Sequence, residues 1–307
     1  MLAYCDVVPV HPRPQPLESL TGYLIRLAEA NLISTVAALV ALLFQRRQLQ
    51  SIRALSDLCP MSLDGVAAAA ACPLPALTAT TLSPVARKFG RTTTLTWFGR
   101  FLSGTLAPSL RYCPACLAER GYRSLLWRFA AVPGCAAHGC YLLDHCGHCS
   151  SAIPFLTSPL LIACCPACGR DLRCCRSAPL QDVDAARTRL EAADAVALVA
   201  PHVIETAERP DRMFGCALTA CRRERGYTRV EVAHRLGISE VAVRSLEIPY
   251  NTPDKEGRDV AEIAFRMYRS ARLSHYLAYL RALDVPVRDI LARCDSPGSP
   301  PCPTSRW

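Results

Sequence analysis

Eight cysteine and histidine residues occur as four pairs, and in each pair two residues separate the ligand-type side chains. Two such side chains on one tight turn can reach a single ion, and tetrahedral zinc takes four thiolate or imidazole ligands. The pattern predicts one site of three cysteines and a histidine, followed by one site of four cysteines. The predicted ligands are Cys113, Cys116, Cys135 and His138 for the first site, and Cys146, Cys149, Cys165 and Cys168 for the second.

Both predicted sites have a full set of four protein ligands, so we expect two structural zinc ions and no catalytic one. Other side chains nearby could replace a ligand, namely His145, His148, Cys140 and Cys164. The regular pairing favours Cys149 and Cys165 over them. Asp144 could orient His138 from behind or be merely solvated, and we expect the latter. No zinc-protease, nucleotide-binding or acidic-triad motif is evident, so we expect a protein that is not an enzyme.

The composition of the chain indicates the cellular compartment in which these sites would function. The N-terminus lacks a basic start followed by an apolar run, so no signal peptide is evident. Of the 18 cysteines, the eleven outside the predicted sites show no paired framework, and free thiols with zinc thiolates fit a reducing cytoplasm better than disulfides do. The longest mainly apolar stretch, residues 33–44, has 12 residues and is too short to span a bilayer. We therefore expect a cytoplasmic protein with no membrane partner.

The chain is basic, with a formal net charge of +9, which two metal-thiolate sites would lower to about +6. Much of the positive charge lies between residues 85 and 130, interleaved with aromatic residues. This mixture suits a phosphate backbone, but the aromatics could equally be core and the basic groups a solvated face. The basic residues are Arg87, Lys88, Arg91, Arg100, Arg111, Arg120, Arg123 and Arg128.

The remaining sequence predicts a mainly α-helical protein. Apolar periodicity predicts helices over residues 18–30 and 34–45, and the polar, alanine-rich stretch 182–200 could form another. Between residues 46 and 84 we expect short helices broken by prolines. Around the zinc ligands we expect small irregular modules with short β-hairpins.

These elements suggest four segments along the chain. A first domain covers residues 1–175, with a helical N-terminal part and tandem zinc modules at about 111–175. A linker with one helix follows at 176–212, and a helical domain covers 213–294. The tail, 295–307, is rich in proline and serine, and we expect it to be disordered.

Residues 226–247 carry the signature of a helix-turn-helix. Thr228 and Glu231 form a capping box, and Gly237 supplies the positive φ that ends the first helix. Ile238 is expected to plug the turn, and Ser239 to cap the second helix. That helix would enter a major groove. The candidate DNA contacts are Arg229, Ser239, Glu240, Val241 and Arg244.

The stretch ALTACRRERGYTRVEVAHRLGIS resembles Cro-type, lambda-repressor-like domains. Two departures stand out, since Ile248 and Pro249 follow the closing glutamate, and Glu240 stands where that family often has an amide. A carboxylate is repelled by phosphates but can accept a hydrogen bond from cytosine.

A second resemblance covers about residues 9–170. PRPQPLESLTGYLIRLAEAN, RYCPACLAERGY, LWRFAAVPGCAAHGCYLLDHCGHC and CPACG are similar, in this order, to the TniQ family of transposition targeting proteins. The resemblance implies a non-catalytic protein that recognises an attachment site or an RNA-guided effector complex and passes it to an AAA+ ATPase. It also implies that the eight ligands form the two fingers of that family.

The interpretation that joins these features is a DNA-targeting adaptor for transposition in the bacterial cytoplasm. The implied partners are DNA, an AAA+ ATPase regulator and, as an alternative route, an RNA-guided effector complex. Some related proteins act as dimers, so a homodimer is a further option. The competing interpretation is a zinc-containing helix-turn-helix transcriptional regulator.

Overall fold

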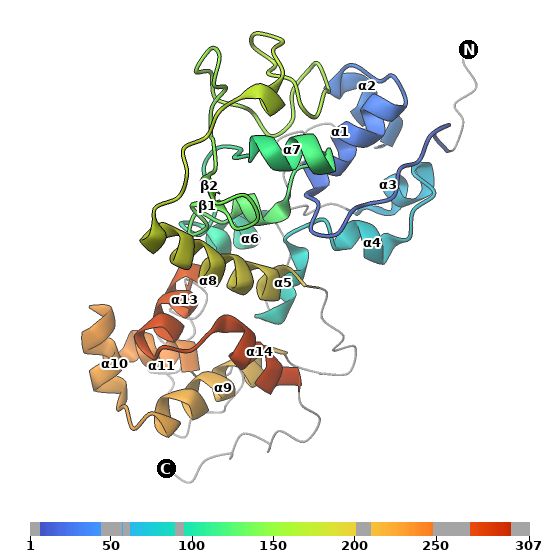
Figure 1. Ribbon diagram of the computed structural model, residues 1–307. Coiled ribbons are helices and arrows are strands. Elements are labelled where there is room, and N and C mark those ends of the chain that lie inside the picture. The colour runs from blue at the N-terminus through green and yellow to red at the C-terminus, as the bar shows by residue number, and fades with distance from the viewer. Residues whose placement is uncertain are drawn as a thin grey trace. The chain divides into compact units, whose positions relative to one another are not determined.

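The computed structural model describes residues 7–43, 57, 62–89, 95–200, 210–247 and 271–295. The chain divides into two units, the first formed by residues 1–83 and 106–199 and the second by residues 84–105 and 200–307. Both are mainly helical, as predicted (Figure 1). The described helices include none with the length and apolar character needed to cross a lipid bilayer.

The first unit is built around α1 (Leu20–Ala30), which is buried on nearly all sides. The helix begins later than predicted because Ser19 caps it, accepting a hydrogen bond from the Gly22 amide at 3.1 Å. Glu18 stays outside the helix, with its side chain fully buried and paired to Arg26 at 2.7 Å. Three short helices follow α1 and supply part of the same core: α2 (Val36–Leu43), α3 (Asp64–Ala69) and α4 (Leu74–Thr78). The next helix, α5 (Ser83–Lys88), lies almost wholly in the second unit.

Prolines in this region begin helices, whereas the sequence suggested that they break them. Pro73 is the N-cap of α4, Pro75 lies in its first turn, and Pro84 is the second residue of α5. The first turn of a helix needs no backbone N–H from these positions, and the fixed φ of proline favours helix entry.

The eight candidate ligands lie in a compact, irregular region that runs from the N-cap of α7 (Pro114–Arg120) to just before η3 (Leu172–Cys174). The 3-10 helix η2 (Leu125–Arg128) follows α7, and β1 (Gly134–Cys135) pairs antiparallel with β2 (Cys140–Tyr141). This is the expected hairpin of the first module. In the second module the described residues form isolated bridges, His145 with Ala152 and Cys164 with Asp171, where a hairpin was expected.

The two ligand-bearing modules pack against each other. Five of the eight ligands, three from the first module and two from the second, share a single apolar core that includes Tyr112, Leu142, Ile153 and Leu172. Tyr112 and Leu143 exchange backbone hydrogen bonds of 2.8 and 2.9 Å, and α7 of the first module packs against η3 of the second. The modules therefore fold as one body.

Helix α8 (Asp182–Val199) forms where a linker helix was predicted, and it belongs to the first unit. It packs against β1 and η2, and the Tyr141 hydroxyl donates a 2.5 Å hydrogen bond to Asp184. Residues 182–199 are thus part of a folded unit, although the sequence placed them in a linker.

The second unit contains α6 (Leu95–Leu102), α9 (Pro210–Glu224), α10 (Arg229–Leu236), α11 (Glu240–Glu247), α13 (Leu273–Ala282) and α14 (Val287–Asp295). Four aromatic rings tie residues 84–105 to the C-terminal helices, with neighbouring ring centroids 4.3 to 6.4 Å apart. They are Phe89, Phe101, Phe214 and Tyr276. Residues 84–105 therefore belong with the C-terminal unit, whereas the sequence assigned them to the N-terminal domain. The expected disordered tail lies outside the described residues, apart from Asp295.

A buried glutamate organises the second unit. The Glu247 side chain at the end of α11 is fully buried, and the Nε atoms of Arg222 and Arg229 donate to it at 2.6 and 2.8 Å. The Tyr279 hydroxyl donates to the same carboxylate at 2.5 Å. Burial alone would raise the pKa of Glu247, but the donors from Arg222, Tyr279 and Arg229 outweigh it and lower the pKa. One charge thus links α9, α10, α11 and α13.

Removing this charge should destabilise the second unit. Glu247→Ala leaves the buried Arg222 without its counter-charge, so we expect a loss of about 3–5 kcal/mol in unfolding free energy. Chemical denaturation followed by circular dichroism measures it, and Glu240→Ala, an exposed position in the same helix, should change little.

The pH dependence provides a second check. A carboxyl with a lowered folded-state pKa stabilises the fold above its unfolded-state pKa, and this contribution disappears as the pH falls through the folded-state value. The stability gap between the native chain and Glu247→Gln should therefore shrink in acid. A constant gap from neutral pH into that range would contradict the role of the charge.

Candidate functional site

The first four candidate ligands converge on one point. The Nδ1 atom of His138 lies 3.5, 3.3 and 3.4 Å from the Sγ atoms of Cys113, Cys116 and Cys135. The Sγ atoms of Cys116 and Cys135 are 3.5 Å apart. Zinc bonds of about 2.0–2.3 Å in tetrahedral geometry place ligand atoms about 3.3–3.8 Å from each other. The donor set and its spacing therefore fit one tetrahedral metal ion.

Local structure explains how these side chains meet. Cys113 is the N-cap of α7, and Pro114 begins the helix, so Cys116 lies in the first turn beside it. Cys135 lies in β1, and Gly139, with a φ of 60°, turns the chain back after His138. Hydrogen bonds from the Cys116 and Cys135 thiols lower the pKa of Cys113, which favours a thiolate in the cluster.

A carboxylate that the sequence did not single out holds the histidine. Glu119 of α7 accepts a hydrogen bond of 2.9 Å from Nε2 of His138, on the far side of the ring from the thiols. This contact raises the pKa of His138 and favours the tautomer whose Nδ1 lone pair points at the cluster. Asp144, which we weighed for this role, instead accepts a 2.7 Å hydrogen bond from His145 on the surface.

Cys140 lies beside the first cluster without joining it. Its Sγ atom is 3.7 Å from that of Cys113, but Cys140 does not belong to the group of donors that lie within 4.8 Å of one another. Burial raises the pKa of its thiol to about 12, so the thiol stays protonated and can donate to the Cys113 sulfur. The geometry thus places Cys140 behind a ligand.

The second cluster brings together Cys146, Cys149, Cys165 and Cys168, whose sulfur atoms all lie within 4.8 Å of one another. The Cys146–Cys168 and Cys149–Cys165 sulfur distances are 3.8 and 3.7 Å, close to the spacing around a tetrahedral zinc ion. Hydrogen bonding to Ser151 lowers the pKa of Cys149 to about 6. His145, His148 and Cys164 are not members of this group.

Two backbone turns shape the second cluster. The Ser150 amide donates to the Cys146 carbonyl at 2.9 Å, and the Gly169 amide donates to the Cys165 carbonyl at 2.8 Å. Gly169 has a φ of 69°, a conformation that other residues adopt at a cost. Each turn thus carries one buried and one exposed cysteine to the same point.

Three arginines of the basic stretch have an internal role. The Arg111 guanidinium donates to the carbonyl oxygens of Trp127, Phe129 and Val132. Burial lowers the pKa of Arg111 to about 10, still above neutral pH. Arg111 therefore joins the loop after η2 to the first module.

Arg123 and Arg128 are also buried, with 3% and 6% of their surfaces exposed. Arg123 donates to the carbonyls of Phe155 and Ile162 at 3.3 and 3.2 Å. Arg128 lies 3.6 Å from the centroid of the Phe155 ring and 3.3 Å from the Asp57 carboxylate. These side chains are neither a phosphate-binding surface nor a solvated face, which were the two alternatives from sequence. The Arg87 side chain and Arg91 lie outside the described residues.

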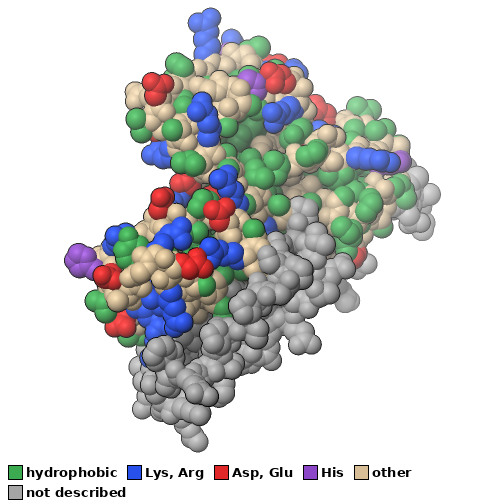
Figure 2. Space-filling model, turned by 60° about the horizontal axis from the view of Figure 1, so that its bottom comes forward, with side chains coloured by type: hydrophobic (Ala, Val, Ile, Leu, Met, Phe, Trp, Pro, Cys, Tyr) green, Lys and Arg blue, Asp and Glu red, His purple; other side chains and the backbone are tan. Residues whose placement is uncertain are grey.

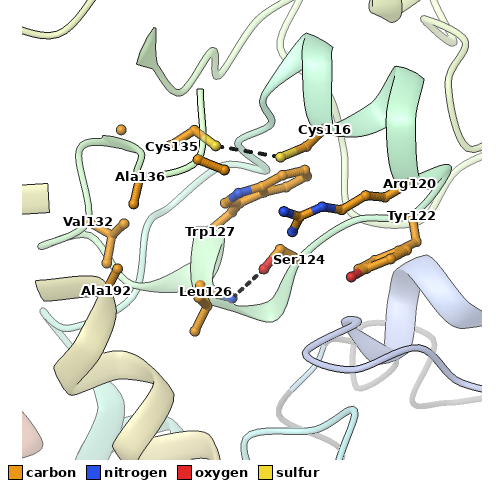
Figure 3. A pocket seen from close by; sticks show the side chains of 12 residues that line it. Cys116, Arg120, Tyr122, Ser124, Leu126, Trp127, Val132, Cys135, Ala136 and Ala192 are labelled. Carbon is orange, nitrogen blue, oxygen red and sulfur yellow. Dashed lines mark hydrogen bonds between the residues drawn. The ribbon is translucent and has the colours of Figure 1, made fainter. Parts of the chain in front are cut away.

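Arg120 remains at the surface, at the rim of a small pocket beside the first cluster. The cavity has a volume of about 160 Å³ and is lined by Trp127, Tyr122, Leu126 and Ala192, among others. Figure 3 shows the Arg120 guanidinium reaching over it near Trp127.

On the face drawn in Figure 2, Lys and Arg side chains are interspersed with Asp and Glu among the described residues.

The second unit contains the predicted helix-turn-helix elements. Thr228 and Glu231 make both hydrogen bonds of the capping box, and Gly237 ends α10 with a φ of 63°. The Ala242 amide donates to the Ser239 hydroxyl at 3.2 Å, which caps α11 as expected. The expectation for Ile238 was wrong, because its side chain is 38% exposed while its amide closes the end of α10.

The five candidate DNA contacts do not share one environment. Ser239, Glu240 and Val241 are exposed at the start of α11, and Arg244 is half-buried. Arg229 is held by its ion pair with the buried Glu247. The outward surface of α11 is therefore short and carries an acid, so base contact by these residues stays a prediction.

Glu119 should set the metal affinity of the first cluster. Its contact orients the His138 ring, and loss of such a contact typically weakens metal binding about 10–100-fold. We expect Glu119→Ala to weaken one of two sites by this amount in a competition titration with a zinc chelator. Asp144→Ala is the matched control, and an equal effect of both variants would contradict the assignment.

Comparison with known families agrees with this geometry. Residues 9–142 match the model of the TniQ family, a segment that contains α1, α7, the β1–β2 hairpin and the whole first cluster, and ends before Cys146. No curated protein matches the chain. Residues 9–142 are therefore a TniQ domain.

Proposed function

We propose that this protein is a non-catalytic adaptor that selects target DNA for transposition and recruits an AAA+ ATPase regulator. The observation that carries the proposal is the TniQ domain at residues 9–142, which supports a transposition-associated targeting role. The protein would recruit the ATPase in the bacterial cytoplasm, where free thiols and metal thiolates are stable.

The two clusters are proposed to hold structural zinc. Four protein donors meet at each point, so a tetrahedral ion would have no open position for a substrate or an activated water. Mixed sulfur and imidazole ligands suit zinc among the divalent metals. A metal at each point would lock the shared core between the modules, and the clusters would then serve as scaffold for recognition.

Target recognition is proposed to use the exposed start of α11, with Ser239, Glu240 and Val241 outward and Arg244 beside them. The glycine turn, the capping box and the two short helices support a DNA-binding helix-turn-helix. An RNA-guided effector complex is the alternative route to the target, in which this surface would contact protein instead of DNA.

A second candidate function is transcriptional regulation. All helix-turn-helix elements lie in the second unit and outside the segment that matches TniQ. A repressor-like module of this kind could bind an operator without a transposition partner. The two functions therefore differ in which partner the protein must bind.

Native mass spectrometry should find two zinc ions on each chain. Cys113→Ser and Cys165→Ser should each lose one ion and loosen the first unit, because metal closure supplies folding energy there. Cys140→Ser and Cys164→Ser, at nearby cysteines outside the clusters, should keep both ions. One ion or none on the native chain would contradict the ligand assignment.

The adaptor function is tested by capture of a partner. The full chain should retain an AAA+ ATPase regulator of transposition, in the presence of DNA, on an affinity column. Val241→Glu places a second acid beside Glu240, so it should weaken DNA retention while leaving ATPase capture intact. Val230→Glu, at another exposed position of the same unit, is the matched control.

Failure to retain the ATPase, combined with repression of the chain's own promoter, would favour the transcriptional regulator. Retention of the ATPase without any DNA binding by the native chain would point to the effector-complex route.

A further inference from the structure

Cys140 projects from the same face of the β1–β2 hairpin as a metal ligand. In the antiparallel pairing of the two strands, Cys140 lies directly opposite Cys135, one of the four donors of the first cluster. Side chains of directly opposed residues in such a pair point to the same face, with Cβ atoms about 4.5–5.5 Å apart. The hairpin therefore directs the Cys140 sulfur toward the metal point, although Cys140 is not one of the four donors there.

The distance from this sulfur to the cluster is that between two ligands. The Sγ atom of Cys140 lies 3.7 Å from that of Cys113, and in the second cluster the donors Cys149 and Cys165 have the same sulfur separation. A tetrahedral zinc ion with bonds of about 2.3 Å separates its sulfur ligands by about 3.8 Å. The first cluster is thus bordered by a fifth donor, which lies at ligand distance from one of its sulfur atoms.

His138 is the donor of the first cluster that is most open to solvent. Cys113, Cys116 and Cys135 are 0%, 3% and 6% exposed, whereas the His138 side chain is 19% exposed. The Glu119 side chain, which contacts the far side of the imidazole, is itself 60% exposed. Departure of the imidazole would thus leave three buried sulfur donors and one open position.

The turn between His138 and Cys140 keeps both donors beside the cluster. The Gly139 amide donates to the Cys135 carbonyl at 2.9 Å, and the Leu180 amide donates to the Gly139 carbonyl at 2.7 Å. Because these hydrogen bonds hold the backbone on both sides of Gly139, an exchange of donors falls to the side chains of its two neighbours. The position that His138 leaves can therefore be filled from the same turn.

We propose that Cys140 is an alternative ligand of the first cluster, which takes the place of His138 and gives an all-cysteine site for zinc and other thiophilic metal ions. In this exchange the bond from the His138 Nδ1 atom to the metal breaks, a bond from the Cys140 Sγ atom forms, and the thiol proton passes to water. The exchange needs no oxidant and no further ligand. The inference rests on the proposed zinc site, whose own test is the ion count of the native chain.

Native mass spectrometry of the full chain loaded with zinc tests the alternative ligand. His138→Ala should keep two ions and the native circular dichroism spectrum, because Cys140 completes the first cluster. His138→Ala/Cys140→Ser should lose one ion, since neither donor is left for the fourth position. The matched control is His138→Ala/Cys164→Ser, which removes another half-buried cysteine outside both clusters and should keep two ions.

Cobalt(II) in place of zinc shows whether sulfur or water fills the fourth position. Each thiolate bound to cobalt(II) adds charge-transfer absorption in the near ultraviolet. His138→Ala should therefore absorb more strongly than the native chain, because eight thiolates would bind cobalt in place of seven.

A native chain with two zinc ions and a His138→Ala chain with one would overturn the alternative ligand and leave the zinc proposal intact. Two ions on His138→Ala/Cys140→Ser, or no rise in the cobalt absorption of His138→Ala, would also overturn it, because water would then occupy the fourth position. Fewer than two ions on the native chain would contradict the zinc sites, and the alternative ligand with them.

Discussion

The first unit depends on one small core, to which both groups of metal-type ligands are tied. Cys113, Cys116 and Cys135 pack into the same apolar cluster as Cys146 and Cys165. Distortion of either cluster would therefore disturb the other and the hairpin between them. This segment has little regular secondary structure, so few backbone hydrogen bonds stabilise it. Binding of a metal ion by four ligands would therefore contribute much of its folding energy. The two clusters therefore share the core of the first unit and depend on each other for their geometry.

Buried charged side chains also hold separate parts of the chain together, in both units of the molecule. Arg111 and Arg123 donate to carbonyl oxygens of irregular loops in the first unit, and Arg128 lies against the Phe155 ring and the Asp57 carboxylate. In the second unit, Glu247 accepts hydrogen bonds from three other helices. Such groups are costly to bury unless each has partners, so they specify one arrangement of the loops and helices around them. Among the described residues, the rim of the Arg120 pocket and the start of α11 remain exposed.

Much of the candidate site follows from short-range sequence. The CxxC spacing predicted which eight side chains meet, and Thr228, Glu231 and Gly237 predicted the ends of α10, because each signal acts within a few residues. Glu119 was missed, although its place three residues after Cys116 on α7 was a usable signal. The prediction that the Ile238 side chain fills the turn was wrong. The Ile238 amide closes the turn by its hydrogen bond, so the side chain can face solvent.

Sequence by itself determined the mainly helical class, the two ligand sets and the resemblance that the TniQ match confirmed. Only the tertiary structure decided which basic residues are internal, that the two modules share a core, and that residues 84–105 join the C-terminal unit. The physical reason is distance along the chain. A turn or cap is encoded where it forms, whereas the partner of Arg128, Phe89 or Glu247 lies tens to nearly two hundred residues away and is chosen by packing.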